Sequence, residues 1–226
     1  MALINVREVY PGVLLGLWQT VETSGEFFER YDFLAPYRGH VEKTFRSEGR
    51  KTEFLAVHAL LHEILAVSGF RHGADAGGGS DAPVIGHAAS GQPLLRGWHV
   101  GVTHTKGYAA LIMSRNCDVA CDIEYFSDRV ERIRSKFMRK DEKADGLDSL
   151  LVHWCGKETV YKLFPSDSLG FQQMRVRPFS TMSDWSCEVE NLKRGLTVRV
   201  DFELTMQFVL TYAFRTVKKQ PCGGGK

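Results

Sequence analysis

Apolar residues follow two patterns along the chain. The first pattern, short runs of apolar residues, predicts strands. Runs rich in β-branched and aromatic residues, bounded by Gly, Pro or Asn, are typical of β-strands. Such runs lie at 12–22, 99–105, 108–114, 117–126, 186–192, 196–205 and 206–214. The last two follow each other directly, so we expect them to form a hairpin.

The second pattern, a helical spacing, marks segments 50–70 and 147–164. In the first segment, the apolar residues near one helical face are Phe54, Val57, Leu61, Leu65 and Val67. Gly69 stands where that helix is expected to end. Shorter helices are expected at 25–35 and 129–138.

Each half of the chain is predicted to contain strands and one main helix. The order of elements therefore begins again near Arg115 and Asn116. We therefore expect a mixed α and β (α+β) fold of two similar lobes, residues 1–115 and 116–220. The Gly-rich segment 71–83 is expected to be a loop, and 221–226 a flexible tail. The halves share no residue-level repeat.

Composition narrows the class of protein. The 226 residues are 43% hydrophobic and 25% charged, which is typical of a packed globular chain. A net charge of +2 gives no argument for nucleic-acid binding. The five cysteines form no C-x-x-C pair, and no apolar run approaches the length of a membrane span. We expect a cytoplasmic protein without a membrane segment.

Two carboxylates lie close together in the predicted strand 117–126. Asp122 and Glu124 are two positions apart, so both point to one face of the strand, opposite Cys121 and Ile123. Burying two acids together is costly unless a cation neutralises them, and oxygen ligands suit Mg²⁺. The alternative is a strand end at which both acids reach solvent.

The helix 147–164 carries a second set of polar residues. Trp154, Glu158 and Lys162 follow each other at intervals of four residues and share one helical face. The alternative is an ordinary exposed Glu–Lys pair. In the segment 103–107, His104 and Thr105 end an apolar strand before Gly107, where imidazole, hydroxyl and backbone donors suit a phosphate.

These motifs together resemble a known family. The chain carries T-H-T at 103–105, D-I-E at 122–124 and W-x-x-K-E-x-x-x-K at 154–162, in that order. The order and spacing resemble the 4′-phosphopantetheinyl transferase superfamily, in its larger single-chain form, a pseudo-dimer of two α/β lobes. The segments 91–95 and 46–61 resemble further parts of its first lobe.

The resemblance implies an enzyme that transfers 4′-phosphopantetheine from coenzyme A to a serine of an acyl or peptidyl carrier protein, releasing adenosine 3′,5′-bisphosphate. It implies Mg²⁺ held by Asp122, Glu124 and Glu158, and Lys162 beside the leaving phosphate. Glu158 is the first choice of base for the serine and Glu124 the second. A chain that holds both lobes is expected to act as a monomer.

The resemblance also suggests groups that bind coenzyme A. His104 and Thr105 are expected at the pyrophosphate, with Lys157 adding positive charge nearby. Arg46, Arg50 and Lys51 are candidates for the 3′-phosphate, because phosphate sites favour Arg and Lys; a solvated helix start is the alternative.

The segment 129–140 holds six basic residues in twelve positions: Arg129, Arg132, Arg134, Lys136, Arg139 and Lys140. It is either a solvated helix face or a surface that attracts an acidic carrier protein. Glu142 beyond it resembles a further family acid.

Other classes of function are left open by the sequence. His58 and His62 are four residues apart on a helix, but they have no H-E-x-x-H glutamate or third ligand, so packing histidines are favoured over zinc ligands. A non-catalytic module that binds coenzyme A or a carrier protein is the main alternative function. An unrelated Mg²⁺-dependent nucleotide enzyme is the third.

Overall fold

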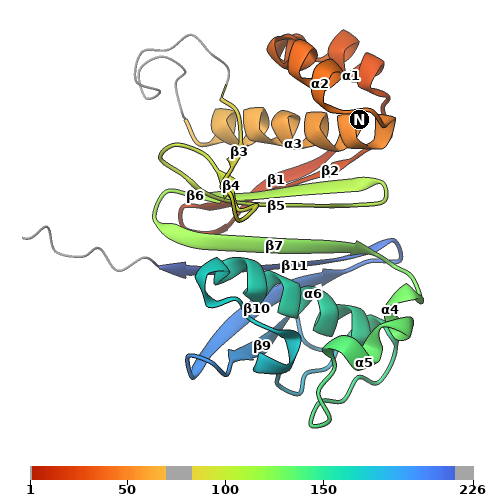
Figure 1. The fold of residues 1–226 in the computed structure, drawn as a ribbon, viewed down its shortest axis with the longest axis vertical. Coiled ribbons are helices and arrows are strands. Elements are labelled where there is room, and N and C mark those ends of the chain that lie inside the picture. The colour runs from red at the N-terminus through yellow and green to blue at the C-terminus, as the bar shows by residue number, and fades with distance from the viewer. Residues whose placement is uncertain (1, 70–82, 217–226) are drawn as a thin grey trace, which may run out of the picture.

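The structure is a computed structural model that describes residues 2–69 and 83–216. Its elements form four layers, with helices on the two outer faces and two β-sheets between them (Figure 1). The fold is therefore mixed α and β, as the hydrophobic pattern predicts. The predicted tail at 221–226 and all but the last residue of the predicted loop 71–83 lie outside the described residues.

The first half builds one sheet and the helices that cover it. The sheet has the order β1-β2-β6-β5, with all neighbours antiparallel. Its strands are β1 (Leu3–Tyr10), β2 (Val13–Gln19), β5 (His99–Thr105) and β6 (Tyr108–Ser114). The helices are α1 (Ser24–Arg30), η1 (Asp32–Tyr37), α2 (Arg38–Thr44) and α3 (Glu48–Val67), and β3 (Gly86–His87) pairs with β4 (Pro93–Leu94).

The second half builds a five-stranded sheet with the order β7-β11-β10-β9-β8. Its strands are β7 (Cys117–Tyr125), β8 (Met174–Val176), β9 (Ser186–Asn191), β10 (Leu196–Leu204) and β11 (Phe208–Thr216). Its helices are α4 (Arg129–Arg132), α5 (Arg134–Phe137), α6 (Leu147–Leu163), η2 (Pro165–Asp167) and η3 (Phe171–Gln173). The predicted hairpin is confirmed, since β10 and β11 pair antiparallel.

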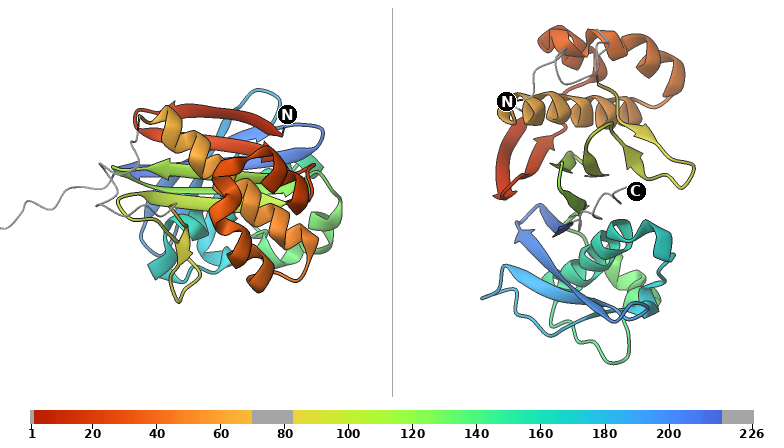
Figure 2. Two further views of the ribbon diagram at one scale, coloured as in Figure 1. Left: turned by 90° about the horizontal axis from the view of Figure 1, so that it is seen from above. Right: turned by 90° about the vertical axis from the view of Figure 1, so that its left-hand side faces the viewer.

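Three apolar layers hold these elements together. One lies between α3 and the first sheet, one between α6 and the second sheet, and the third between the two sheets. The middle layer includes Leu15 and Leu17 of β2, Ile112 of β6, and Cys121 and Ile123 of β7. Figure 2 shows the two halves stacked sheet against sheet, with their helices facing outwards.

Two predictions about helices need correction. Val67 was expected on the packed face of α3, but it is 63% exposed, because it is the last residue of the helix. The predicted helix 129–138 is two single turns, α4 and α5, broken at Ile133.

The strand β1 was not predicted; its half-buried pattern is that of an edge strand, paired only with β2.

The two sheets approach each other most closely where β5 lies beside β7 (Figure 1). Gly101 of β5 makes this approach possible, because a Cβ there would lie 3.1 Å from the Cα of Ala120 and 2.9 Å from Ile112 Cγ2. We call the line of contact between β5 and β7 the seam. The boundary near residue 115 remains a prediction about independent folding units. Among the described residues, no helix is long and apolar enough to cross a lipid bilayer.

Candidate active site beside the seam

The strand β7 presents its two carboxylates to the helix α6. Asp122 contacts Lys162 and Glu124 contacts Trp154, and both partners belong to α6. Cys121 on the same strand packs into the layer between the sheets. The predicted alternation along β7 is therefore confirmed, and the two acids share the face that α6 covers.

Asp122 is buried and held by two partners. Lys162 Nζ donates to its Oδ1 at 2.6 Å, and the Thr103 hydroxyl donates to the same oxygen at 3.3 Å. Its other oxygen, Oδ2, is buried and has no hydrogen-bond partner among the residues that the structure describes. Burial alone would lower the pKa of Lys162, but Asp122, Cys121 and Glu158 together outweigh this effect and the pKa is raised. Lys162 is therefore charged at neutral pH.

Glu124 is held on both oxygens. The indole of Trp154 donates to Oε1 at 3.1 Å, and the Thr105 hydroxyl donates to Oε2 at 3.5 Å. Trp154 also packs against the rings of Phe137 and Phe171, so it both fixes the helix and orients an acid. Burial raises the pKa of Glu124, and Asp122 adds to the rise.

Glu158 is the third acid of the cluster and the only one of the three whose carboxylate has no hydrogen-bond partner among the described residues. Burial, followed by the charge of Asp122, raises its pKa to about 7. Lys162 lowers the pKa and Glu124 raises it further. The helix thus brings Glu158 within electrostatic reach of both strand acids, as the spacing of the motifs predicts.

The chemistry of this cluster fits a hard cation. As the side chains stand, no three His, Cys, Asp or Glu residues in the described ranges are gathered to hold a metal ion. Three carboxylates nevertheless face one region, the pKa values of two are raised, and Asp122 Oδ2 is buried without a donor. An oxygen-seeking divalent cation supplies the positive charge that these acids lack.

The seam itself positions the acids through two hydroxyl groups. Thr103 Oγ1 accepts from the backbone N–H of Ile123 at 3.2 Å, and Thr105 Oγ1 accepts from that of Tyr125 at 3.2 Å. Each hydroxyl then donates to the acid one position earlier on β7. Sequence reasoning missed Thr103, although its alternation with Thr105 along β5 was the signal.

His104 points to the opposite side of β5, into a cavity of about 160 Å³ between α3 and the first sheet. Arg50 Nη1 lies 3.2 Å from its Nε2, and Glu53 Oε1 lies 3.4 Å from its Nδ1. Burial lowers the pKa of His104, partly offset by Glu53. The structure therefore joins two predicted residues, His104 and Arg50, and adds Glu53, which the sequence analysis missed although it lies one turn from Arg50.

Arg46 and Lys51 are not brought to this cavity. Arg46 is exposed in the turn between α2 and α3, and neither residue lines the cavity that contains Arg50. Of the three basic candidates around the start of α3, only Arg50 lies beside His104.

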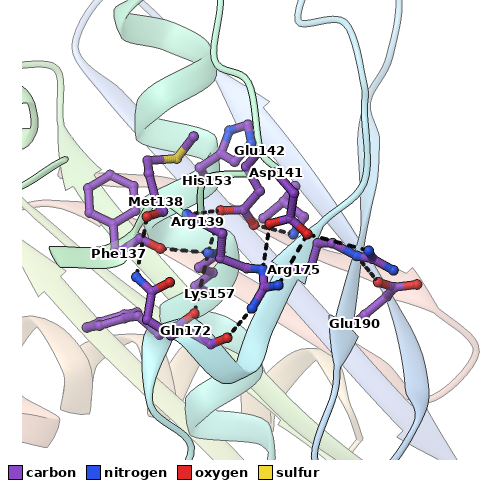
Figure 3. Close-up of polar contacts among 12 residues, drawn as sticks. Phe137, Met138, Arg139, Asp141, Glu142, His153, Lys157, Gln172, Arg175 and Glu190 are labelled. Atoms are coloured by element: carbon purple, nitrogen blue, oxygen red, sulfur yellow. Dashed lines mark hydrogen bonds and ion pairs between the residues drawn. The ribbon is translucent and has the colours of Figure 1, made fainter. Parts of the chain in front are cut away.

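The expectation that Lys157 adds charge near a phosphate is wrong for this structure. Its side chain is fully buried, and Nζ donates to Glu142 Oε2 and to the carbonyl of Phe137, both at 2.7 Å (Figure 3). The other Glu142 oxygen accepts from the backbone N–H of Val176 at 2.6 Å. This pair ties α6 to the segment after α5 and to β8, because a buried ammonium needs a carboxylate partner.

The basic segment 129–140 is mostly exposed, but one of its six residues is engaged internally. Arg139 pairs with Asp141 at 2.8 Å and also donates to the carbonyl of Gln172 (Figure 3). The other five basic side chains lie on exposed residues of α4, α5 and the following turn. His58, by contrast, is buried, donates from Nδ1 to the carbonyl of Phe54 and stacks on its ring, so it is a packing histidine.

The β7–α6 unit also identifies the family. Residues 118–213 match the model of the 4′-phosphopantetheinyl transferase superfamily. These residues form a 4′-phosphopantetheinyl transferase superfamily domain. The matched range contains Asp122, Glu124, Glu158 and Lys162 but begins after the seam residues of β5. No curated protein matches the chain.

Proposed function

We propose that this protein transfers the 4′-phosphopantetheine group of coenzyme A to a serine of an apo acyl or peptidyl carrier protein and releases adenosine 3′,5′-bisphosphate. One observation supports the proposal: within a transferase superfamily domain, three carboxylates and one lysine of β7 and α6 lie within electrostatic reach of one another beside the seam. The single-chain, two-lobed form is part of the same proposal.

Mg²⁺ is the cofactor that suits this cluster. Asp122, Glu124 and Glu158 would hold it, and the buried unpartnered oxygen of Asp122 supports that assignment. When bound, the ion neutralises charge on the pyrophosphate of coenzyme A. The side chains of the protein supply the two other proposed roles, which are removal of the serine proton and stabilisation of the leaving group.

Glu158 is the preferred base for the serine hydroxyl. Both oxygens of Glu124 already accept hydrogen bonds, whereas the carboxylate of Glu158 has none. Glu124 remains the second candidate.

Lys162 stabilises the leaving group. It carries its proton at neutral pH because Asp122 stabilises the charged form, and its side chain is partly exposed beside the acids. A fixed ammonium there stabilises the negative charge that develops on the leaving adenosine bisphosphate. His104 and Arg50 together are suited to a phosphate of coenzyme A, and Thr105 acts mainly by orienting Glu124.

The carrier protein is expected to approach the exposed basic residues at 129–140. A cavity of about 210 Å³ opens between β7, α4 and α6, and it is lined by Glu124, Arg129 and Trp154 among others. An acidic partner docked there brings a serine to the side of the cluster that contains Glu124.

The direct test is transfer itself. Purified protein is incubated with coenzyme A, Mg²⁺ and each of several apo carrier proteins, and the carriers are weighed by mass spectrometry. We expect at least one carrier to gain the mass of one phosphopantetheinyl group, with adenosine 3′,5′-bisphosphate in equal amount. No mass gain with any carrier would contradict the proposal.

A non-catalytic module that binds coenzyme A or a carrier protein is the alternative. Calorimetry that detects binding of either ligand, in samples that show no transfer, would favour it. The lysine and three acids in one cluster argue for catalysis, because binding alone has no need of all four groups.

A further inference from the structure

A groove lies between the C-terminal end of α6, the segment 90–94 and the strand β7. Two neighbouring cavities of about 370 and 300 Å³ form it, and they share Gln92, Pro93 and Lys162 in their linings. The 300 Å³ cavity, which we call the arginine pocket, lies at the opposite end of β7 from Glu124, since it contains Asp118 and Val119.

The arginine pocket is rich in positive charge. Its lining includes Lys162, Arg194 and Arg215, as well as His99, whereas Asp118 is its only acid. The carboxylates that pair with Lys162 and Arg194, Asp122 and Asp167, are not part of the lining. The charges that face the cavity are therefore mainly cationic.

The two guanidinium groups are oriented before any ligand arrives. Both lie over the ring of Phe164, at 5.3 Å for Arg194 and 5.0 Å for Arg215. Asp167 binds Arg194 through Nε and Nη2, and Asp118 binds Arg215 through Nη2 at 2.6 Å. Each guanidinium keeps N–H donors that these carboxylates do not use, because arginine has five.

We propose that the arginine pocket is a binding site for a phosphate group. Two guanidinium forks and an ammonium around one polar cavity match the charge and the acceptor geometry of a phosphate monoester. The phosphate has two possible sources: the 3′-phosphate of coenzyme A bound along the groove, or a separate phosphorylated ligand. Only the first source rests on the proposed function.

Inorganic phosphate is the first probe, and the readout is the side-chain Nε–H signals of arginine in a ¹⁵N–¹H spectrum at constant ionic strength. We expect the signals of Arg194 and Arg215 to shift saturably. The matched control is Arg199, an exposed arginine on β10 that is also paired with an aspartate, Asp201, and its signal should stay in place.

Substitutions test the same site. Arg194→Gln with Arg215→Gln should weaken phosphate binding by about tenfold or more, as expected for the loss of charge-assisted hydrogen bonds, whereas Arg199→Gln should leave it unchanged. If the double variant fails to fold, Arg194→Lys keeps the charge beside Asp167 and removes the fork. Unsaturable shifts, equal shifts at Arg199, or unchanged binding in the variants would overturn the proposal.

A second arm identifies the source of the phosphate. Coenzyme A is compared with dephospho-coenzyme A, which lacks the 3′-phosphate, in competition with inorganic phosphate at the arginine pocket. If coenzyme A displaces inorganic phosphate and dephospho-coenzyme A does not, the pocket is assigned to the 3′-phosphate. Unaltered phosphate binding in the presence of saturating coenzyme A assigns it to a separate ligand. A protein that lacks transfer activity still gives both readouts, so the two proposals fail separately.

Discussion

Glu158 shows how one residue gains its chemistry from its neighbours. An isolated glutamate on a helix is ionised well below neutral pH, but burial and the charge of Asp122 raise the pKa of Glu158 to about 7. The same residue lies one position from Lys157, whose side chain points into the core. Of these two adjacent residues on α6, Glu158 therefore belongs to the candidate site, whereas Lys157 contributes to the packing of the helix.

Replacing Glu158 with glutamine should nearly abolish transfer while the protein stays folded. On the proposed function, the change removes a metal-ligand charge and the preferred base, and loss of a general base alone costs about 10²–10⁴ in rate. The rate is measured by the gain in carrier mass with time, and the fold by circular dichroism. Glu29→Gln, at an exposed position on α1, is the control. A wild-type rate in Glu158→Gln would refute its assignment.

The seam hydroxyl of Thr103 should matter to both stability and rate. Thr103→Val leaves the Ile123 N–H without its acceptor and removes one of the two donors to Asp122 Oδ1, which costs about 1–3 kcal/mol of unfolding free energy. Urea denaturation measures this cost, and transfer assays should show a lower kcat. Thr103→Ser keeps the hydroxyl and should restore most of both. Equal behaviour of the Val and Ser variants would show that the hydroxyl has no positioning role.

At the scale of elements, α6 is fixed at two places. Trp154 lies between the rings of Phe137 and Phe171, and the buried Lys157–Glu142 pair joins the helix to β8 and to the segment after α5. These contacts set the position of the helix, and with it the position of Glu158 relative to β7.

Breaking this buried pair should destabilise the protein strongly. Glu142→Gln leaves the Lys157 ammonium without its carboxylate, which costs about 3–5 kcal/mol, because an unpaired buried charge remains. Chemical denaturation measures the loss. The double variant Glu142→Leu with Lys157→Met removes both charges and should recover much of the stability. If Glu142→Gln unfolds at the wild-type denaturant concentration, the pair is not structural.

The sequence predicted elements better than their ends and contacts. The strands at β5, β6, β7, β10 and β11 and the helices α3 and α6 follow from local spacing, which depends only on neighbouring residues. The division of 129–138 into α4 and α5 and the pairing of β1 depend on tertiary contacts. The expectation for Lys157, which came from the family resemblance, was wrong for the same reason, because its burial against Glu142 is a tertiary contact.

At the scale of the whole molecule, stability should depend on pH through the buried His58. Burial lowers its pKa to about 4, so the folded state keeps the ring neutral while the unfolded chain protonates it near 6.5. Its contribution is fully present above pH 6.5 and is lost as the pH falls towards 4. At pH 5 the loss is about 2 kcal/mol relative to pH 7.

The variant His58→Gln isolates this effect. It cannot take up a proton in this range, so its unfolding free energy should fall less between pH 7 and pH 5 than that of the wild type. Denaturant titrations of both proteins at the two pH values measure the difference. Parallel losses in the two proteins would contradict the assignment to His58.

The sequence by itself determined the order of elements and the four residues of the candidate cluster, Asp122, Glu124, Glu158 and Lys162. Alternation along one strand pairs Asp122 with Glu124, and the turn of one helix pairs Glu158 with Lys162; both are local properties of the backbone. The family resemblance implied that the two pairs belong together. The tertiary structure alone decided that Thr103 and Thr105 hold the acids across the seam, that Lys157 is buried, and that Arg194 and Arg215 share a pocket with Lys162. Those facts join residues far apart in the chain, and their positions follow from how two sheets and a helix pack.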